Sequence, residues 1–384
     1  DQYIQNTSIN GLSSFESLNE ADVPTTMGSV QKLQLTTKME KLGTIMLAIG
    51  SEATISLYLG ETQVQQQEGT AFVAASGHVI GTMNPLRGGY GTFHPESVVE
   101  NDGNVWWYCI NRSSVVQYST NGLYPISDFK LKSFLNNRSK SLLQLMATGA
   151  KVNVIAGIDN ENDEYVISFP AVSAIDNGVL NGFLLDDGSR KTIGFNIKNN
   201  LWITSYDIYP EIFSYVNNIL VAFLKGKMYF FGTTNGTDPS PYNNFFGVQY
   251  HSKLSKVINS NVPLVKYMQS VTVEGNICPS HVVLVTYYTY SDNSPVYQST
   301  DLFANEFNWK EGIWYGVFFR DSLTPGQPSP DQALQTGDKM RGQWGYLLLD
   351  FEVVQINGQT PNLVLNSLDI GYNISPGAKT FQTK

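Results

Sequence analysis

The stretch NDGNVWWYCINRSSVVQYSTNGLYPIS (residues 101–127) decides the fold class of this 384-residue chain. It contains two strand-like runs, NVWWYCI (104–110) and SVVQYST (114–120), which are rich in aromatic and β-branched residues. The Asn121-Gly122 pair that follows predicts a hairpin with a type I′ turn, in which both residues have positive φ. The stretch is therefore typical of an antiparallel sheet.

The same pattern of turn, aromatic strand, second turn and strand recurs at 155–169, 193–207, 219–232 and 306–320. Turn signals at roughly 8–12-residue spacing indicate a sandwich, a barrel or a propeller. At roughly 40–50 residues per blade, the chain is long enough for about six to eight blades. We therefore predict an all-β fold, with a β-propeller-like body at 29–384 and a polar N-terminal arm or linker at 1–28.

One segment carries a helical pattern instead. In residues 128–149 the apolar side chains recur at Phe134, Leu135, Leu142, Leu143, Leu145 and Met146, and Gly149 follows as a stop signal. We expect a short helical insertion here.

Composition excludes several classes of protein. Charged residues make up only 15% of the chain, so the composition is not that of a coiled coil, a helical solenoid or a disordered chain. The net charge is −9, and no run of Lys or Arg exceeds two residues. A protein that grips nucleic acid needs a basic face, and the sequence contains no sign of one. No apolar stretch reaches the roughly 18 residues of a membrane-spanning helix.

The reactive side chains form no recognisable catalytic pattern. Cys109 and Cys278 are too far apart in sequence for a metal motif, and we expect buried free thiols. The Gly88–Gly91 run lacks the Lys-Ser/Thr end of a phosphate loop, which favours a closely packed loop. We expect no catalytic, cofactor-binding or metal site and no cofactor, and the four histidines lie far apart in sequence: His78, His94, His251 and His281.

Two acidic segments have alternative interpretations. Residues Asp159–Glu164 alternate oxygen ligands as a calcium loop does, but Gly at position 6 and Glu at position 12 are missing, so a solvated hairpin tip competes with a cation site. Residues Asn101–Trp106 resemble the turn of a sialidase-type Asp box, which would mark a blade turn rather than a catalytic residue.

Aromatic residues are dense and have two possible uses. They could stack on sugars, or they could pack in cores and interfaces, which is the more common use. The clusters are Trp106-Trp107, Tyr287-Tyr288-Tyr290, and Trp309, Trp314 and Tyr315.

Three segments resemble the muzzle, or tail nozzle, proteins of crAss-like short-tailed bacteriophages. The first combines an exposed HPESV motif, a Gly turn, an aromatic strand and a V-x-x-Y-S-x-N-G hairpin. The others resemble the family's Phe-Asn…Trp…Ser-Tyr…Pro-Glu segment and its late Gly-Asp-x-x-Arg-Gly strand. They are His94–Val98 with Gly103, Val105–Tyr108 and Val115–Ser127; residues 195–213; and residues 337–351.

The resemblance implies a structural virion protein at the tail tip. It implies a ring of six copies through which DNA and ejected proteins pass without specific binding, with portal-side adaptor proteins and tail fibres as partners. The chain opens on Asp1 rather than Met, so it is either an expressed fragment or a product of proteolysis. The resemblance favours proteolytic processing, with this chain as the carboxyl-terminal portion and an upstream fragment of the same precursor as a further partner. An acidic chain would repel DNA in transit rather than hold it.

Two alternatives stay open. The first is a non-catalytic carbohydrate-binding adhesin, for which we expect exposed aromatics such as Trp106 or Trp107 to contact the glycan. The second is a propeller-type glycan depolymerase on a phage tail, which would need paired carboxylates that converge in the fold.

Overall fold

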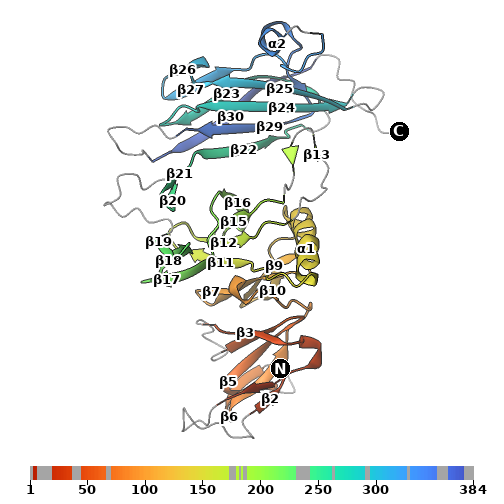
Figure 1. Ribbon diagram of the computed structural model, residues 1–384, viewed down its shortest axis with the longest axis vertical. Helices are drawn as coiled ribbons and strands as arrows, with labels where there is room; N and C mark the ends of the chain where they lie inside the picture. Colours follow the sequence, from red (N-terminus) through yellow and green to blue (C-terminus); the bar gives the residue numbers. More distant parts are fainter. Residues whose placement is uncertain are drawn as a thin grey trace. The chain divides into compact units, whose positions relative to one another are not determined.

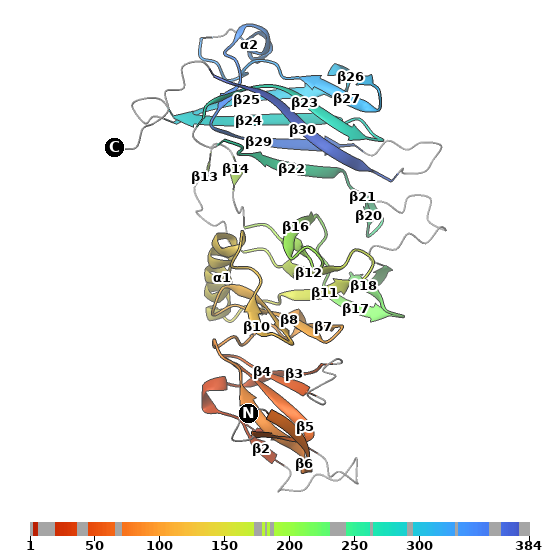
Figure 2. The same cartoon turned by 180° about the vertical axis from the view of Figure 1, so that it is seen from behind.

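The computed structural model describes residues 3–6, 20–36, 45–65, 71–172, 179–180, 183–184, 188–230, 243–261, 264–289, 295–326, 329–352 and 362–375. The chain divides into two compact units, Asp1–Thr233 (unit 1) and Thr234–Lys384 (unit 2). This division is finer than the single body expected at 29–384. Antiparallel sheets dominate both units, and the all-β class is confirmed (Figures 1 and 2).

Unit 1 contains four successive sheets whose strands follow one another in chain order, as in the blades of a propeller. The first sheet is β3 (Val30–Leu35), β4 (Ile45–Gly50), β5 (Thr54–Gln65) and β6 (Ala71–Pro85). The second is β7 (Val99–Asn101), β8 (Asn104–Cys109), β9 (Ser114–Ser119) and β10 (Gly122–Pro125). The third is β11 (Ile155–Asp159), β12 (Glu164–Phe169), β15 (Lys191–Asn196) and β16 (Leu201–Tyr206). The fourth is β17 (Ile212–Val216), β18 (Ile219–Leu224) and β19 (Lys227–Phe230).

Side chains of β8 explain why its sequence is a continuous apolar run. Val105 and Trp107 pack with Ile45 and Leu47 of the first sheet. Trp106 and Tyr108 point the other way and join a cluster with the third sheet. Because both faces of the strand are buried, no polar residue alternates with the apolar ones.

Tight turns join the strands of these sheets. Asp102 and Gly103 both have positive φ, 51° and 81°, in the two-residue loop between β7 and β8, so the Asp-box-like segment is a hairpin turn. At Asn121-Gly122 only Gly122 has positive φ, 92°, so the type I′ prediction for this turn is wrong although the hairpin forms. The reason is register: Gly122 already pairs with Ser119 as the first residue of β10.

The expected helical insertion is α1 (Lys132–Ala147), inside the predicted 128–149 range. Leu135 and Leu142 are fully buried against the second and third sheets. Gly149, with φ of 82°, donates its N–H to the Met146 carbonyl at 2.9 Å and ends the helix. Within the described residues, neither α1 nor the second helix has the length and hydropathy that a bilayer crossing requires.

The segment expected as an arm, residues 1–28, contributes to the core of unit 1 where it is described. It contains β1 (Tyr3–Gln5), β2 (Glu20–Asp22) and a 3-10 turn at Thr25–Met27. Ile4, Val23 and Met27 are buried against Ala48 and Leu57, on the side of the first sheet that faces away from the second. Residues 1–28 are therefore not a free arm, because three apolar side chains in this mostly polar segment pack into the core.

Unit 2 is built from two sheets that enclose one core. The strands of the first, in spatial order, are β22 (Ser252–Ile258), β29 (Trp344–Phe351), β24 (His281–Thr289) and β25 (Pro295–Phe303). Those of the second are β26 (Phe307–Lys310), β27 (Ile313–Val317), β23 (Lys266–Gly275) and β28 (Arg341–Gly342), and β30 (Leu365–Ile374) also pairs with β23. This non-consecutive order is that of a sandwich rather than of a blade.

Alternating side chains fill the space between these two sheets. On β29, Leu347, Leu349 and Phe351 point inward and are buried, while the residues between them are partly exposed. The helix α2 (Pro330–Thr336) begins after Ser329, whose hydroxyl accepts the N–H of Gln332 at 3.2 Å. Two short strand pairs complete the description: β13 (Val179–Leu180) with β14 (Phe183–Leu184) in unit 1, and β20 (Asn244–Phe245) with β21 (Val248–Gln249) in unit 2. Two further 3-10 turns lie at Pro95–Ser97 in unit 1 and Ala304–Glu306 in unit 2.

Candidate functional site

The histidines are dispersed, each in its own environment. His281 Nε2 lies 3.0 Å from Asp301 Oδ1, and His251 Nδ1 lies 3.0 Å from Asp350 Oδ1. His94 is fully buried in unit 1, as are Ser97 and Val98, so the expectation of an exposed HPESV motif is wrong. Burial lowers the pKa of His94 to about 4, and its ring stacks on Tyr108. His78 lies in β6, and its side chain is outside the described residues. The described residues contain no group of three His, Cys, Asp or Glu side chains suited to a metal ion.

Residues Asp159–Glu164 form the tip of the β11–β12 hairpin, with Asp159 paired to Glu164. The two end residues are buried rather than solvated. Asp159 accepts the N–H of Glu161 at 3.0 Å and the amide of Asn162 at 2.6 Å. Glu164 accepts the hydroxyls of Thr204 and Tyr206, and Asp163 pairs with Lys198. Their carboxylates are thus directed to separate protein donors.

Both cysteines are free thiols, but only Cys109 is buried as expected, and Cys278 is partly exposed. Burial raises the pKa of both thiols, to about 11 for Cys278. The glycine-rich loop is a packing feature, as the sequence favoured. A Cβ on Gly91 would lie 2.4 Å from the Gly50 carbonyl oxygen and 2.5 Å from the Glu52 nitrogen. The loop at 88–91 therefore lies directly against the β4–β5 turn.

The aromatic clusters divide into buried and exposed groups. Trp106 and Trp107 lie in the cores of unit 1, so the expectation that they contact a glycan is wrong. The reason is that β8 is covered on both faces. In unit 2, Tyr287 stacks on Trp344 at 5.2 Å, and the rings of Trp309 and Trp314 lie 4.5 Å apart. Trp309 and Tyr315 are exposed, and Tyr290 lies outside the described residues.

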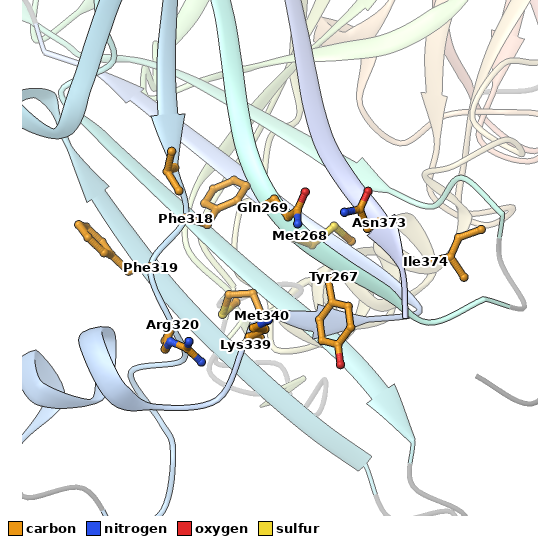
Figure 3. A pocket seen from close by; sticks show the side chains of 11 residues that line it. Tyr267, Met268, Gln269, Phe318, Phe319, Arg320, Lys339, Met340, Asn373 and Ile374 are labelled. Atoms are coloured by element: carbon orange, nitrogen blue, oxygen red, sulfur yellow. The ribbon is translucent and has the colours of Figure 1, made fainter. Parts of the chain in front are cut away.

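A pocket of about 630 Å³ opens in unit 2, where one strand changes partners (Figure 3). β23 pairs with β27 along Ser270–Glu274 and with β28 along Lys266–Tyr267. Between these stretches, Phe318 donates its N–H to Gln269 at 2.8 Å, and Met268 donates its N–H to Met340 at 3.1 Å. The two segments that pair with β23 on this side, one from β27 and one from β28, diverge here. Their divergence leaves a hollow beside β23.

The pocket has an apolar floor and a basic rim. Its floor consists of three buried side chains, those of Met268, Phe318 and Met340. Its rim includes Arg320 and Lys339, which lie on the two diverging segments. In Figure 3 these side chains are seen around the hollow, with the ring of Tyr267 beside Lys339. The size falls within the usual range of small-ligand sites, roughly 300–1,000 Å³.

Two cationic side chains lie against the ring of Tyr267, which lines the pocket. The Arg341 guanidinium lies 4.8 Å from its ring centroid and the Lys339 ammonium 5.8 Å. Its hydroxyl also accepts a hydrogen bond from Arg341. Hydrogen bonds from Ser375 and Arg341 lower the pKa of Tyr267, as expected for a phenol held among cations.

Unit 1 carries a second noteworthy surface, on the fourth sheet. The strand register places on one face only uncharged residues: Ile212, Ser214, Val216, Ile219, Val221, Phe223, Met228 and Phe230. Met228, Phe230 and Ile212 are 48%, 49% and 47% exposed, whereas Val221 at the middle of the face is fully buried. The opposite face carries Phe213 and Leu220, which are buried against Gly157 of β11. We call the first group the apolar face of β17–β19.

Comparison with known proteins adds little to this picture. No protein-family model and no curated protein matches the chain. Among solved structures, the chain is similar to one titled AfRom2 CNH domain, at 10% identity and a TM-score of 0.25. The match covers 60% of this chain and 63% of that domain, so it spans less than two thirds of the domain's length.

Proposed function

We propose that this chain is a non-catalytic structural subunit of a phage tail, part of the distal nozzle ring at the tail tip. One observation carries the proposal beyond the sequence resemblance: the apolar face of β17–β19. Its Met228, Phe230 and Ile212 side chains are about half exposed in the chain by itself. Half-exposed apolar side chains clustered on one sheet face are typical of a surface that becomes buried on assembly.

A second copy of the chain is the occupant that charge favours. Each copy carries a net charge of −9, so two copies repel one another over most of their surface. The apolar face contains no charged side chain, and contact there buries apolar area with the least repulsion. A ring of six copies is the assembly that the resemblance implies.

The acidic chain also suits a conduit. Each Lys or Arg contact to a phosphate would slow the passage of DNA, whereas negative charge keeps the polymer off the wall. In the proposed assembly, adaptor proteins hold the ring on the portal side, tail fibres attach to it, and DNA passes without specific binding.

Electron microscopy of the virus particle tests this proposal. Particles that carry the protein are incubated with an antibody against the chain and gold-labelled. We expect labelling at the tail tip. Labelling of the capsid, or absence of the chain from purified particles, would contradict the proposal.

A further inference from the structure

Two basic side chains, Arg320 and Lys339, line the pocket of unit 2, and a third, Arg341, lies beside it against the ring of Tyr267. Among the ion pairs of the described residues, none involves Arg320, Lys339 or Arg341. Arg320 donates to the Gly337 carbonyl at 3.0 Å, and Arg341 donates to the Tyr267 hydroxyl. Two acidic residues lie on the same segments. Asp321 accepts the N–H groups of Ser299 and Leu323 at 2.9 and 3.0 Å, and the exposed Asp338 directly precedes Lys339. An excess of cations in an otherwise acidic chain predicts an anionic ligand.

The remaining lining restricts the kind of anion. Gln269 and Asn373 present exposed amides at the rim, which both donate and accept hydrogen bonds. The floor of Met268, Phe318 and Met340 is apolar. A bare inorganic ion would use the cations and leave the amides and the floor without contacts. A ring with hydroxyl groups, an apolar face and one acidic substituent uses all three.

The topology disfavours an acidic peptide. Peptides commonly dock by adding a strand to an open sheet edge. At the pocket, β23 is already paired with β30 on one side and with β27 and β28 on the other. Its backbone groups are therefore engaged, and recognition has to rest on side chains.

From this geometry we propose that the pocket binds an acidic saccharide, with its carboxylate between Lys339 and Arg341 and its ring over the apolar floor. The site lies within unit 2 and does not depend on the proposed role in a tail ring. A tail protein with such a site would contact acidic surface glycans.

Isothermal titration calorimetry with the full chain tests the proposal. The probes are a galacturonic acid trimer, a neutral galactose trimer, a polyglutamate peptide and sodium sulfate. We expect the acidic trimer to bind with a Kd of about 0.1–1 mM, and the other three to bind at least about tenfold more weakly.

Three variants refine the test. Lys339→Gln removes an exposed charge and should weaken binding several-fold, and Lys339→Gln combined with Arg341→Gln should weaken it by about tenfold or more. Lys310→Gln removes an exposed lysine on β26 of the same unit and should leave binding unchanged. Thermal unfolding of each variant shows whether a loss of binding reflects a loss of fold.

Several outcomes would overturn the proposal. Equal binding of the neutral trimer would remove the role of the charges. Equal binding of sulfate would mean that the site takes an ion without a sugar, and equal binding of polyglutamate would identify a peptide site. No measurable binding of any probe, or equal losses in the Lys339→Gln and Lys310→Gln variants, would also overturn it.

Discussion

The buried side chain of His94 makes the folding stability of the chain depend on pH. Its ring is fully buried and stacked on Tyr108, at a centroid distance of 5.7 Å. Burial disfavours the imidazolium ion and lowers the pKa to about 4, against 6.5 for an unperturbed histidine. The unfolded chain therefore binds a proton between these values that the folded chain does not.

Because the unfolded chain binds this proton, the free energy of unfolding falls as the pH is lowered. The stabilising contribution of neutral His94 is fully present above pH 6.5 and is lost as the pH falls toward 4. Between pH 7 and pH 5, the loss in unfolding free energy is about 2 kcal/mol. Urea unfolding followed by tryptophan fluorescence at the two pH values measures it. In the His94→Leu variant the difference should shrink by about that amount, and an unchanged difference would contradict the assignment.

At the scale of elements, Arg138 of α1 forms hydrogen bonds with residues 170–189, which lie more than 30 positions later in the sequence. Its side chain is fully buried and donates to the carbonyls of Ser189 at 2.8 Å and Pro170 at 3.2 Å. A helix that packs by Leu135 and Leu142 is thus also fixed by hydrogen bonds from a charged group. Hydrogen bonds from a charged donor stabilise more than neutral ones.

The Arg138→Met variant should lower the unfolding free energy by about 2–4 kcal/mol, because methionine fills part of the space but donates nothing. Lys140→Met is the matched control, since Lys140 is exposed on the same helix and its replacement should change stability by less than about 0.5 kcal/mol. Thermal or urea unfolding of both variants makes the comparison. Equal stabilities would mean that Arg138 does not hold the segment.

The elements also show where sequence reasoning succeeds and where it stops. Local signals were sufficient for the helix at 132–147, whose apolar spacing and terminal Gly149 are contiguous. Trp106 and Trp107 were open to two interpretations, because burial of both faces of β8 depends on sheets that come earlier and later in the chain. The pocket had no local signal, since Tyr267 and Arg341 meet only when β23 and β28 pair.

At the scale of the whole molecule, the all-β class followed from hairpin signals, but the division at residue 233 did not. Both units are rich in the same strand-forming residue types, so composition does not distinguish them. They differ in strand order, which is consecutive in the sheets of unit 1 and non-consecutive in the sandwich of unit 2. Strand order depends on long-range pairing, for which a single sequence carries little information. The tail role and the ring remain predictions at this scale.

The apolar face of β17–β19 makes the ring prediction testable with matched variants. The Met228→Asp/Phe230→Asp double variant places two charges on that face. It should abolish self-association because burying an unpaired carboxylate is costly. Phe129→Asp is the control, since Phe129 is an equally large side chain exposed elsewhere in unit 1. It should leave the assembly unchanged.

The most direct test of the central claim is the solution mass of the full chain by size-exclusion chromatography with light scattering. The account predicts a mass several times the 42.6 kDa of one chain, reduced to 42.6 kDa in the double variant and unchanged in the Phe129→Asp variant. A mass of 42.6 kDa for the unmodified chain at its highest soluble concentration would contradict assembly through this face.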